Sequence, residues 1–150
     1  MVRQRLLFGG RTRRGRDERG ASAVEFALLL IPLLWIVFGI ISFGFMLTFR
    51  QTLSQAATEG ARAAAVELDD ANRSPEGLAA INDAMQAVGK TCGSGGLTCT
   101  VSPPAACGTS RCVTVTVTYA YQANPMIPSP PLVNEVMPET ITYTATVRVS

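Results

Sequence analysis

The feature that most constrains this chain is an apolar stretch without a charged residue, which runs from Phe26 to Phe49. About 20 residues are enough to cross the hydrocarbon core of a bilayer as a helix, and this stretch is longer. The h-region of a cleaved secretory signal is shorter, about 7–15 residues. A soluble helix would keep one polar side, and this stretch has none. The sequence therefore predicts one transmembrane helix, with the lipid bilayer as its first partner.

Positive charge is concentrated directly before the apolar stretch. The first twenty residues hold seven arginines and two acidic residues, whereas the rest of the chain holds six basic and nine acidic side chains. Such a basic segment is a solvated tail, a contact for nucleic acid, or a signal that keeps a terminus in the cytoplasm. Its place beside a membrane helix favours the third interpretation, and we expect no nucleic-acid partner. The chain then divides into a cytoplasmic leader over residues 1–20, a transmembrane helix over 21–49 and an extracytoplasmic domain over 50–150.

One carboxylate, Glu25, lies at the start of the expected membrane helix. A carboxylate at the bilayer edge costs free energy unless it is hydrated at headgroup level or paired with a cation. Cutting the chain after Gly20 would create that cation, because Ala21 would then carry a free α-amino group. Glu25 would become the fifth residue, where it also interacts favourably with the helix dipole. The residues alone leave hydration and pairing both open. Pro32, further along, is expected to kink the membrane helix.

The helix is expected to continue beyond the membrane, as one element over about residues 21–69. The outer part, residues 50–70, carries a ladder of small side chains formed by Ala56, Gly60 and Ala64. Small residues four apart let another backbone approach closely. That backbone belongs either to this chain's own domain or to a second subunit, and the sequence leaves both alternatives open.

A second, amphipathic helix is expected over about residues 75–88, with Ser74 as its N-cap and Pro75 in its first position. Further on, apolar residues alternate with mostly threonine residues over about 112–122 and 139–149. This period of two predicts antiparallel strands with one apolar face. The outer half of the long helix can cover that face. We therefore expect a membrane-anchored α+β fold, in which the long helix continues outward and packs on a small antiparallel β-sheet.

Four cysteines lie in a segment rich in glycine, serine and proline, a composition that predicts a loop. Within this loop we expect a short strand over residues 97–101. Their spacing lacks the close pairs of a zinc site and the C-x-x-C pattern of a redox site. Outside the cytoplasm, two disulfides are expected; free buried thiols are the alternative. Three pairings are possible, and the sequence does not choose among them. The four residues are Cys92, Cys99, Cys107 and Cys112.

Nothing in the sequence indicates enzyme chemistry. The chain has no histidine, which removes the commonest general base and the commonest metal ligand. Gly93, Gly95 and Gly96 stand in a loop without the strand and helix that a phosphate-binding loop requires. We therefore expect no catalytic, cofactor or metal site and no small-molecule substrate.

The residues around the apolar stretch resemble a known family. A basic leader, Gly20 and then Glu25 at the fifth place of an apolar helix is similar to the type IV prepilin signal. The segments "GASAVEFA" and "EGARAAA" resemble the TadE-like family of tight-adherence (Flp-type) pilus proteins. The resemblance implies a pilin-like fold and a bacterial inner-membrane precursor. It also implies cleavage between Gly20 and Ala21 by a prepilin peptidase, and Glu25 as the pilin-like glutamate. Ala21 differs from the phenylalanine that typical pilins carry there.

Two functions follow as expectations. The first is a structural, minor pilin-like component, or pseudopilin, which assembles with other pilus subunits through its apolar helix and is itself incorporated into an extracellular pilus or remains in the membrane. The second is a single-span anchor that is not processed and that presents its outer sheet to a binding partner. In both, the N-terminus is cytoplasmic and the C-terminal domain lies outside the cytoplasmic membrane.

Overall fold

The computed structural model describes residues 17–127 and 135–149. Most of the expected basic leader lies outside the described residues, as does part of the loop that precedes the last strand. The chain divides into two compact units, Met1–Val37 and Phe38–Ser150, and each is described by itself. The first unit contains the beginning of helix α1 (Asp17–Val66). The second contains the rest of α1, helix α2 (Arg73–Gln86) and a β-sheet.

Helix α1 forms as one element of 50 residues and continues through Pro32. It begins at Asp17, four residues before the expected start, and ends at Val66 rather than near residue 69. The early end has a local cause, because acidic side chains take the backbone donors that would extend the helix. A carboxylate oxygen of Glu67 accepts from the N–H of Asp69 at 3.1 Å, and the Asp69 carboxylate accepts from the N–H of Ala71 at 3.0 Å.

Helix α2 begins two residues before the predicted start, so the assignment of Ser74 as N-cap is wrong. The N-cap is Asn72, whose side chain makes no capping bond. Its amide nitrogen Nδ2 donates to the Asp69 carboxylate at 3.1 Å. Pro75 is therefore the third residue of the helix. It is tolerated there because backbone N–H groups of the first turn have no acceptor within the helix.

The sheet has β3 (Ser110–Tyr119) at its centre, paired antiparallel with all the other strands. On one side lie β1 (Leu97–Val101) and β2 (Ala105–Cys107), and on the other lies β4 (Ile141–Val149). Strand β1 has its predicted bounds, whereas β2 was not predicted. Strand β3 starts earlier and ends earlier than the expected 112–122. It ends at Tyr119 because the following residues turn, with the N–H of Asn124 donating to the carbonyl of Ala120 at 3.1 Å.

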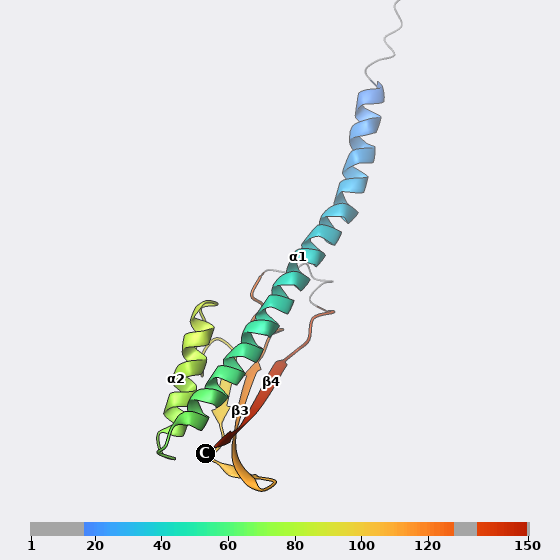
Figure 1. Cartoon of the computed structure of the whole chain (residues 1–150). Helices are drawn as coiled ribbons and strands as arrows, with labels where there is room; N and C mark the ends of the chain where they lie inside the picture. Colours follow the sequence, from blue (N-terminus) through green and yellow to red (C-terminus); the bar gives the residue numbers. More distant parts are fainter. Residues whose placement is uncertain (1–16, 128–134, 150) are drawn as a thin grey trace, which may run out of the picture. The chain divides into compact units, whose positions relative to one another are not determined.

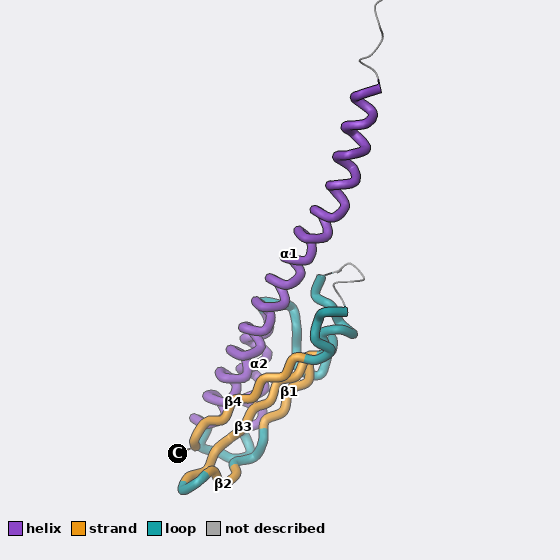
Figure 2. Tube along the Cα trace, turned by 90° about the vertical axis from the view of Figure 1, so that its right-hand side faces the viewer, coloured by secondary structure: helices purple, strands orange, loops and turns teal. Residues whose placement is uncertain are grey.

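Within the second unit, both helices cover the same face of the sheet (Figures 1 and 2). The predicted alternation holds, since the inward residues of β3 are fully buried and its threonines are not. From α1, Phe49 and Leu53 fill the space above them, and the ring of Phe49 meets that of Tyr119 edge-on at 4.6 Å between centroids. The inward residues of β3 are Val113, Val115, Val117 and Tyr119. The α+β fold with a helix covering an antiparallel sheet is therefore confirmed.

Candidate functional site

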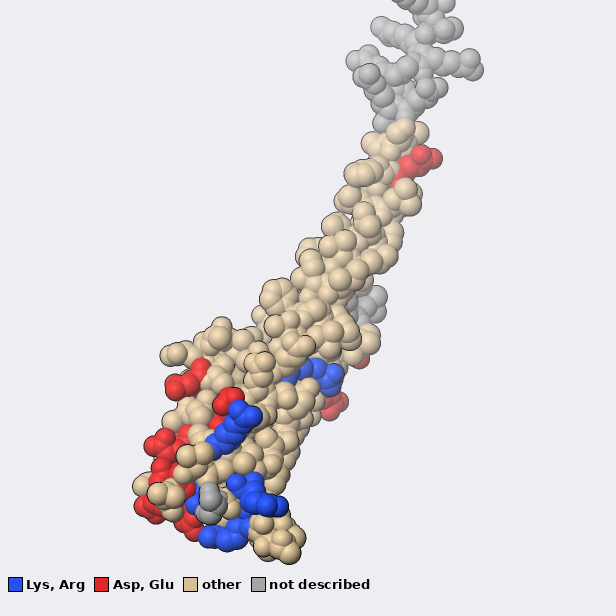
Figure 3. Space-filling model, in the orientation of Figure 1, with Lys and Arg blue, Asp and Glu red and all other residues tan. Residues whose placement is uncertain are grey.

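The first part of α1 presents apolar side chains to its surroundings instead of burying them. Phe26, Leu29 and Ile40 each expose about two thirds of their surface or more, at 65, 71 and 68%. The helix from Gly20 to Val66 is long and apolar enough to cross a membrane, and only 6% of its most apolar 18-residue stretch is buried. Figure 3 shows charged side chains gathered on the part of the molecule that holds α2 and the strands. Large exposed apolar surfaces of this kind mark contact with lipid or protein.

The candidate processing site lies on the surface of this helix. Gly20, Ala21 and Glu25 are all exposed and all lie inside α1. A Cβ atom added to Gly20 would meet no atom within 4 Å, and the backbone of Gly20 is not in the left-handed region. Neither packing nor conformation therefore accounts for a glycine at this position.

The small-residue ladder is packed inside the second unit. Ala56, Gly60 and Ala64 are buried, and α2 supplies the partner surface. A Cβ on Gly60 would lie 2.5 Å from Cγ1 of Ile81, and a Cβ on Gly77 would lie 3.1 Å from the carbonyl oxygen of Gly60. The ladder thus lets α1 and α2 approach closely within one chain.

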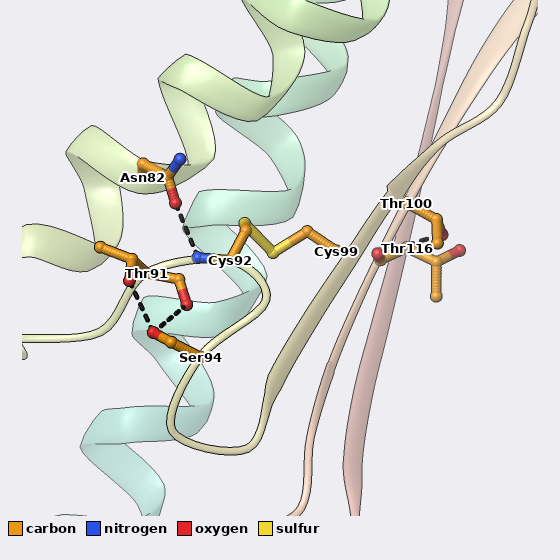
Figure 4. The surroundings of a disulfide bond; sticks show 7 residues. All are labelled: Asn82, Thr91, Cys92, Ser94, Cys99, Thr100 and Thr116. Atoms are coloured by element: carbon orange, nitrogen blue, oxygen red, sulfur yellow. Dashed lines mark hydrogen bonds between the residues drawn. A yellow bond between two sulfur atoms is a disulfide. The ribbon is translucent and has the colours of Figure 1, made fainter.

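The cysteines form two disulfides that join near neighbours in the chain. Cys92 pairs with Cys99 and ties the segment after α2 to β1, while Cys107 pairs with Cys112 and closes the β2–β3 hairpin. The N–H of Cys92 also donates to the side chain of Asn82 on α2 at 2.8 Å (Figure 4). The first bridge therefore links the helical layer to the sheet.

A charged cluster that the sequence did not reveal joins the end of α1 to the sheet. Arg73 is 4% exposed and donates from Nη1 to the carbonyl oxygens of Ala64 at 2.8 Å and Ala65 at 3.1 Å. It thereby satisfies the last turn of α1. Asp70 accepts from Arg73 at 2.7 Å and from Arg111, beside the β2–β3 turn, at 2.8 Å. These hydrogen bonds, from Arg111 and then from Arg73, lower the pKa of the Asp70 carboxyl.

The opposite face of the sheet carries a row of cross-strand hydroxyl pairs between β3 and β4. The side-chain oxygens of β3 and β4 threonines lie 3.0 to 3.2 Å apart in three successive cross-strand pairs. The pairs are Thr114 with Thr146, Thr116 with Thr144, and Thr118 with Thr142.

In the part of the chain that the structure describes, no group of three or more histidine, cysteine or acidic side chains is placed to hold a metal ion.

The part of the chain that the structure describes thus has one helix long and apolar enough to span a membrane, followed by a disulfide-bonded α+β domain. This is the arrangement of a membrane-anchored protein. Residues 20–62 match the model of a family described as TadE-like protein. The resemblance to the TadE-like family is therefore confirmed over this segment, which holds the apolar stretch and the small-residue ladder. The match ends within α1, so α2 and the sheet lie outside it. Neither a curated protein nor a solved structure matches the chain.

Proposed function

We propose that this chain is a minor pilin-like component, a pseudopilin, of a tight-adherence pilus or a related secretion system. The TadE-like match supports a role in assembly of such a pilus. The observation that carries the finer proposal is the pair Gly20 and Glu25. Gly20 is a glycine that the fold does not require, and Glu25 is the one charged residue between it and Phe49.

The mechanism is helix association without chemistry of its own. Cleavage after Gly20 leaves an α-amino group on Ala21, which pairs with Glu25 of the same chain or of a neighbour. Pairing removes the cost of an isolated charge beside hydrocarbon. The exposed apolar side chains of α1 then pack against other pilin-like helices, and the α+β domain stays outside the bilayer.

The proposed orientation places the N-terminus in the cytoplasm and the sheet outside the inner membrane. Arginines before the span favour that orientation, and disulfides persist in oxidising compartments rather than in the cytoplasm. Protease added to spheroplasts should digest the domain after α1, whereas a cytoplasmic marker should remain intact. Protection of the domain from the protease would contradict the proposed orientation and indicate the reverse one.

Processing is tested by co-expressing the chain with the prepilin peptidase of its own host. The intact mass should fall by the mass of residues 1–20. Gly20→Leu should block this cleavage because a large side chain replaces the glycine before the cut. Gly39→Leu, at a second helical glycine outside the signal, should be processed normally. An unprocessed wild-type chain would contradict the proposal.

That contrary result would favour the second function, an anchored binding module. Its supporting observation is the threonine face of β3 and β4, which presents hydroxyl and methyl groups in a regular row. Exposed Arg148 lies at one end of this row. Under this alternative the leader persists and the sheet domain alone determines the partner.

A further inference from the structure

The second half of the apolar stretch belongs to the domain rather than to a free helix. Every residue from Gly20 to Phe38 is exposed, whereas Ser42, Met46 and Phe49 are only 4, 3 and 4% exposed. These three residues recur four and three apart, so they share one face of α1. Met46 and Phe49 are part of the core that α1 forms with the sheet. The second compact unit accordingly begins at Phe38, inside the apolar stretch.

A loop of the domain lies alongside the same part of α1. Val136 and Met137, which precede β4, line one hollow together with α1 residues 39–47, and Figure 2 shows loops beside α1 at this end of the sheet. Their segment forms turns and bends rather than a helix or a strand. Two exposed carboxylates flank the pair, Glu135 on one side and Glu139 on the other.

A hydrocarbon boundary after Phe49 conflicts with this loop. Irregular backbone is not exposed to lipid, because hydrocarbon offers no partner to its N–H and carbonyl groups. A carboxylate inside hydrocarbon is also costly, and this boundary would place both Glu135 and Glu139 there. A boundary near Ile40 leaves the loop outside and places a single carboxylate, Glu25, within the span. The second arrangement therefore costs less free energy.

We propose that the hydrocarbon boundary on the domain side crosses α1 near Ile40, and that the end of the domain holding Val136 contacts the phospholipid headgroup layer. This lipid surface is continuous with the membrane span of the same helix. The headgroup layer is about 5–8 Å thick on each side, which corresponds to about three to five further helical residues. Phe43 therefore lies within this layer, as does Val136 beside it, whose side chain is 81% exposed.

The same boundary fixes the other end of the span. About 20 helical residues cross the hydrocarbon, and counting back along α1 from Ile40 leads to Ala21. The expected span of residues 21–49 is thereby shortened to about 21–40. Glu25 then lies four residues inside, or about 6 Å below the boundary, where pairing with a cation stabilises a carboxylate. Only the identity of that cation rests on the proposed function, since the boundary does not depend on cleavage.

The test introduces single cysteines into the full chain, reconstituted in phosphatidylcholine liposomes. All four native cysteines are in disulfides, so each variant carries one free thiol. The positions Ile36, Ile40, Phe43 and Leu47 are all exposed, and their spacing keeps them on one face of α1, so they differ in depth alone. A membrane-impermeant maleimide should label Phe43→Cys and Leu47→Cys. It should leave Ile36→Cys and Ile40→Cys unlabelled until detergent is added, because hydrocarbon excludes the reagent and disfavours the thiolate.

Two control variants calibrate the labelling. Leu29→Cys, at a position 71% exposed within the span, should stay protected, and Leu68→Cys, at a position 87% exposed after α1, should be labelled wherever the boundary lies. One thiol per chain after denaturation verifies that both disulfides have formed. Protection of Phe43→Cys would move the boundary past the loop, and labelling of Ile40→Cys would move it away from the domain. Either result would overturn the proposed boundary.

The headgroup contact is tested separately at Val136. A nitrobenzoxadiazole fluorophore on Val136→Cys should be quenched more strongly by a lipid with a nitroxide on its headgroup than by one with a nitroxide in the middle of its acyl chain. The reverse order would place the loop in hydrocarbon, and quenching by neither lipid would mean that the domain does not touch the membrane. Both of these results would contradict the contact. The same fluorophore on Leu68→Cys should be quenched by neither lipid.

Discussion

At the scale of single residues, Arg73 shows how one buried side chain completes a helix that its own sequence leaves open. The last carbonyl groups of α1 have no helical partners, and α1 has no basic residue in its last turn. Arg73 supplies the donors from the start of α2. Asp70 then connects this arginine to Arg111 beside the sheet. Three charged residues thus hold the α1–α2 turn to the β2–β3 end of the domain.

The lowered pKa of Asp70 makes a prediction about acid stability. The Asp70 carboxylate is hydrogen-bonded to Arg111 and Arg73 only in the folded chain. Its contribution to folding stability is therefore complete above the ordinary pKa of 3.8. The contribution is lost as pH falls through the lower folded pKa. Asp70→Asn should therefore have a lower melting temperature than wild type at neutral pH, with the gap closing below pH 3.8. Thermal unfolding followed by circular dichroism across pH checks this, and a gap that persists in acid would contradict it.

At the scale of elements, the contact between α1 and α2 depends on glycines that face each other. An added Cβ on Gly77 would lie 3.1 Å from the carbonyl oxygen of Gly60, 3.1 Å from Val101 and 3.2 Å from Ala64. These separations are tighter than ordinary packing, and one neighbour is backbone that cannot rotate away. The two helices are therefore as close as their main chains allow, and this closeness sets how α2 lies over β1.

Gly77→Ala should destabilise the domain by about 1–2 kcal/mol. Overpacking costs about 1–3 kcal/mol, and the better helix propensity of alanine returns up to about 1 kcal/mol. Gly44→Ala is the matched control, because its Cβ would meet nothing within 4 Å and only the propensity gain remains. Urea unfolding of the full chain in detergent measures both. Equal stability of Gly77→Ala and wild type would mean that the helices separate at little cost.

The sequence predicts features that depend on neighbouring residues and misses those that depend on contacts between distant residues. The long apolar helix, β1 and the alternation of β3 depend on local periodicity, and all three are found. Strand β2 is three residues long, too short to show a period, and it exists because it pairs with β3. Arg73 was missed because its acceptors are carbonyls eight and nine residues away, and no side-chain pattern reports a carbonyl.

The same limit applies to the candidate sites. Four cysteines allow three pairings, and the observed bridges follow from where β1 and β3 bring the chain. Free thiols, the alternative that the sequence left open, are not found, because all four cysteines form the disulfides Cys92–Cys99 and Cys107–Cys112.

At the scale of the whole molecule, the chain combines an uncharged apolar surface with a domain whose core is complete on its own. Helix α1 contributes to both, because its later residues are buried under the sheet while its earlier ones are exposed. The buried core takes Met46 and Phe49 from the end of the apolar stretch. No residue from Gly20 to Phe38 is buried, so the domain does not need the start of α1 to bury its apolar face. A change near the start of α1 should consequently leave the domain folded.

Glu25→Ala tests that separation together with the pilin-like role. Pilus assembly in the native host should fail, because the neutral side chain no longer pairs with the α-amino group of a processed subunit. Membrane insertion and both disulfides should persist, as read by membrane fractionation and by a thiol assay. Glu59→Ala is the control, since it removes an exposed acidic residue whose partner Arg62 lies 3.9 Å away, a pair expected to contribute little. Normal piliation of Glu25→Ala would refute charge pairing. Loss of the folded domain in that variant would instead show that the start of α1 and the domain are energetically coupled.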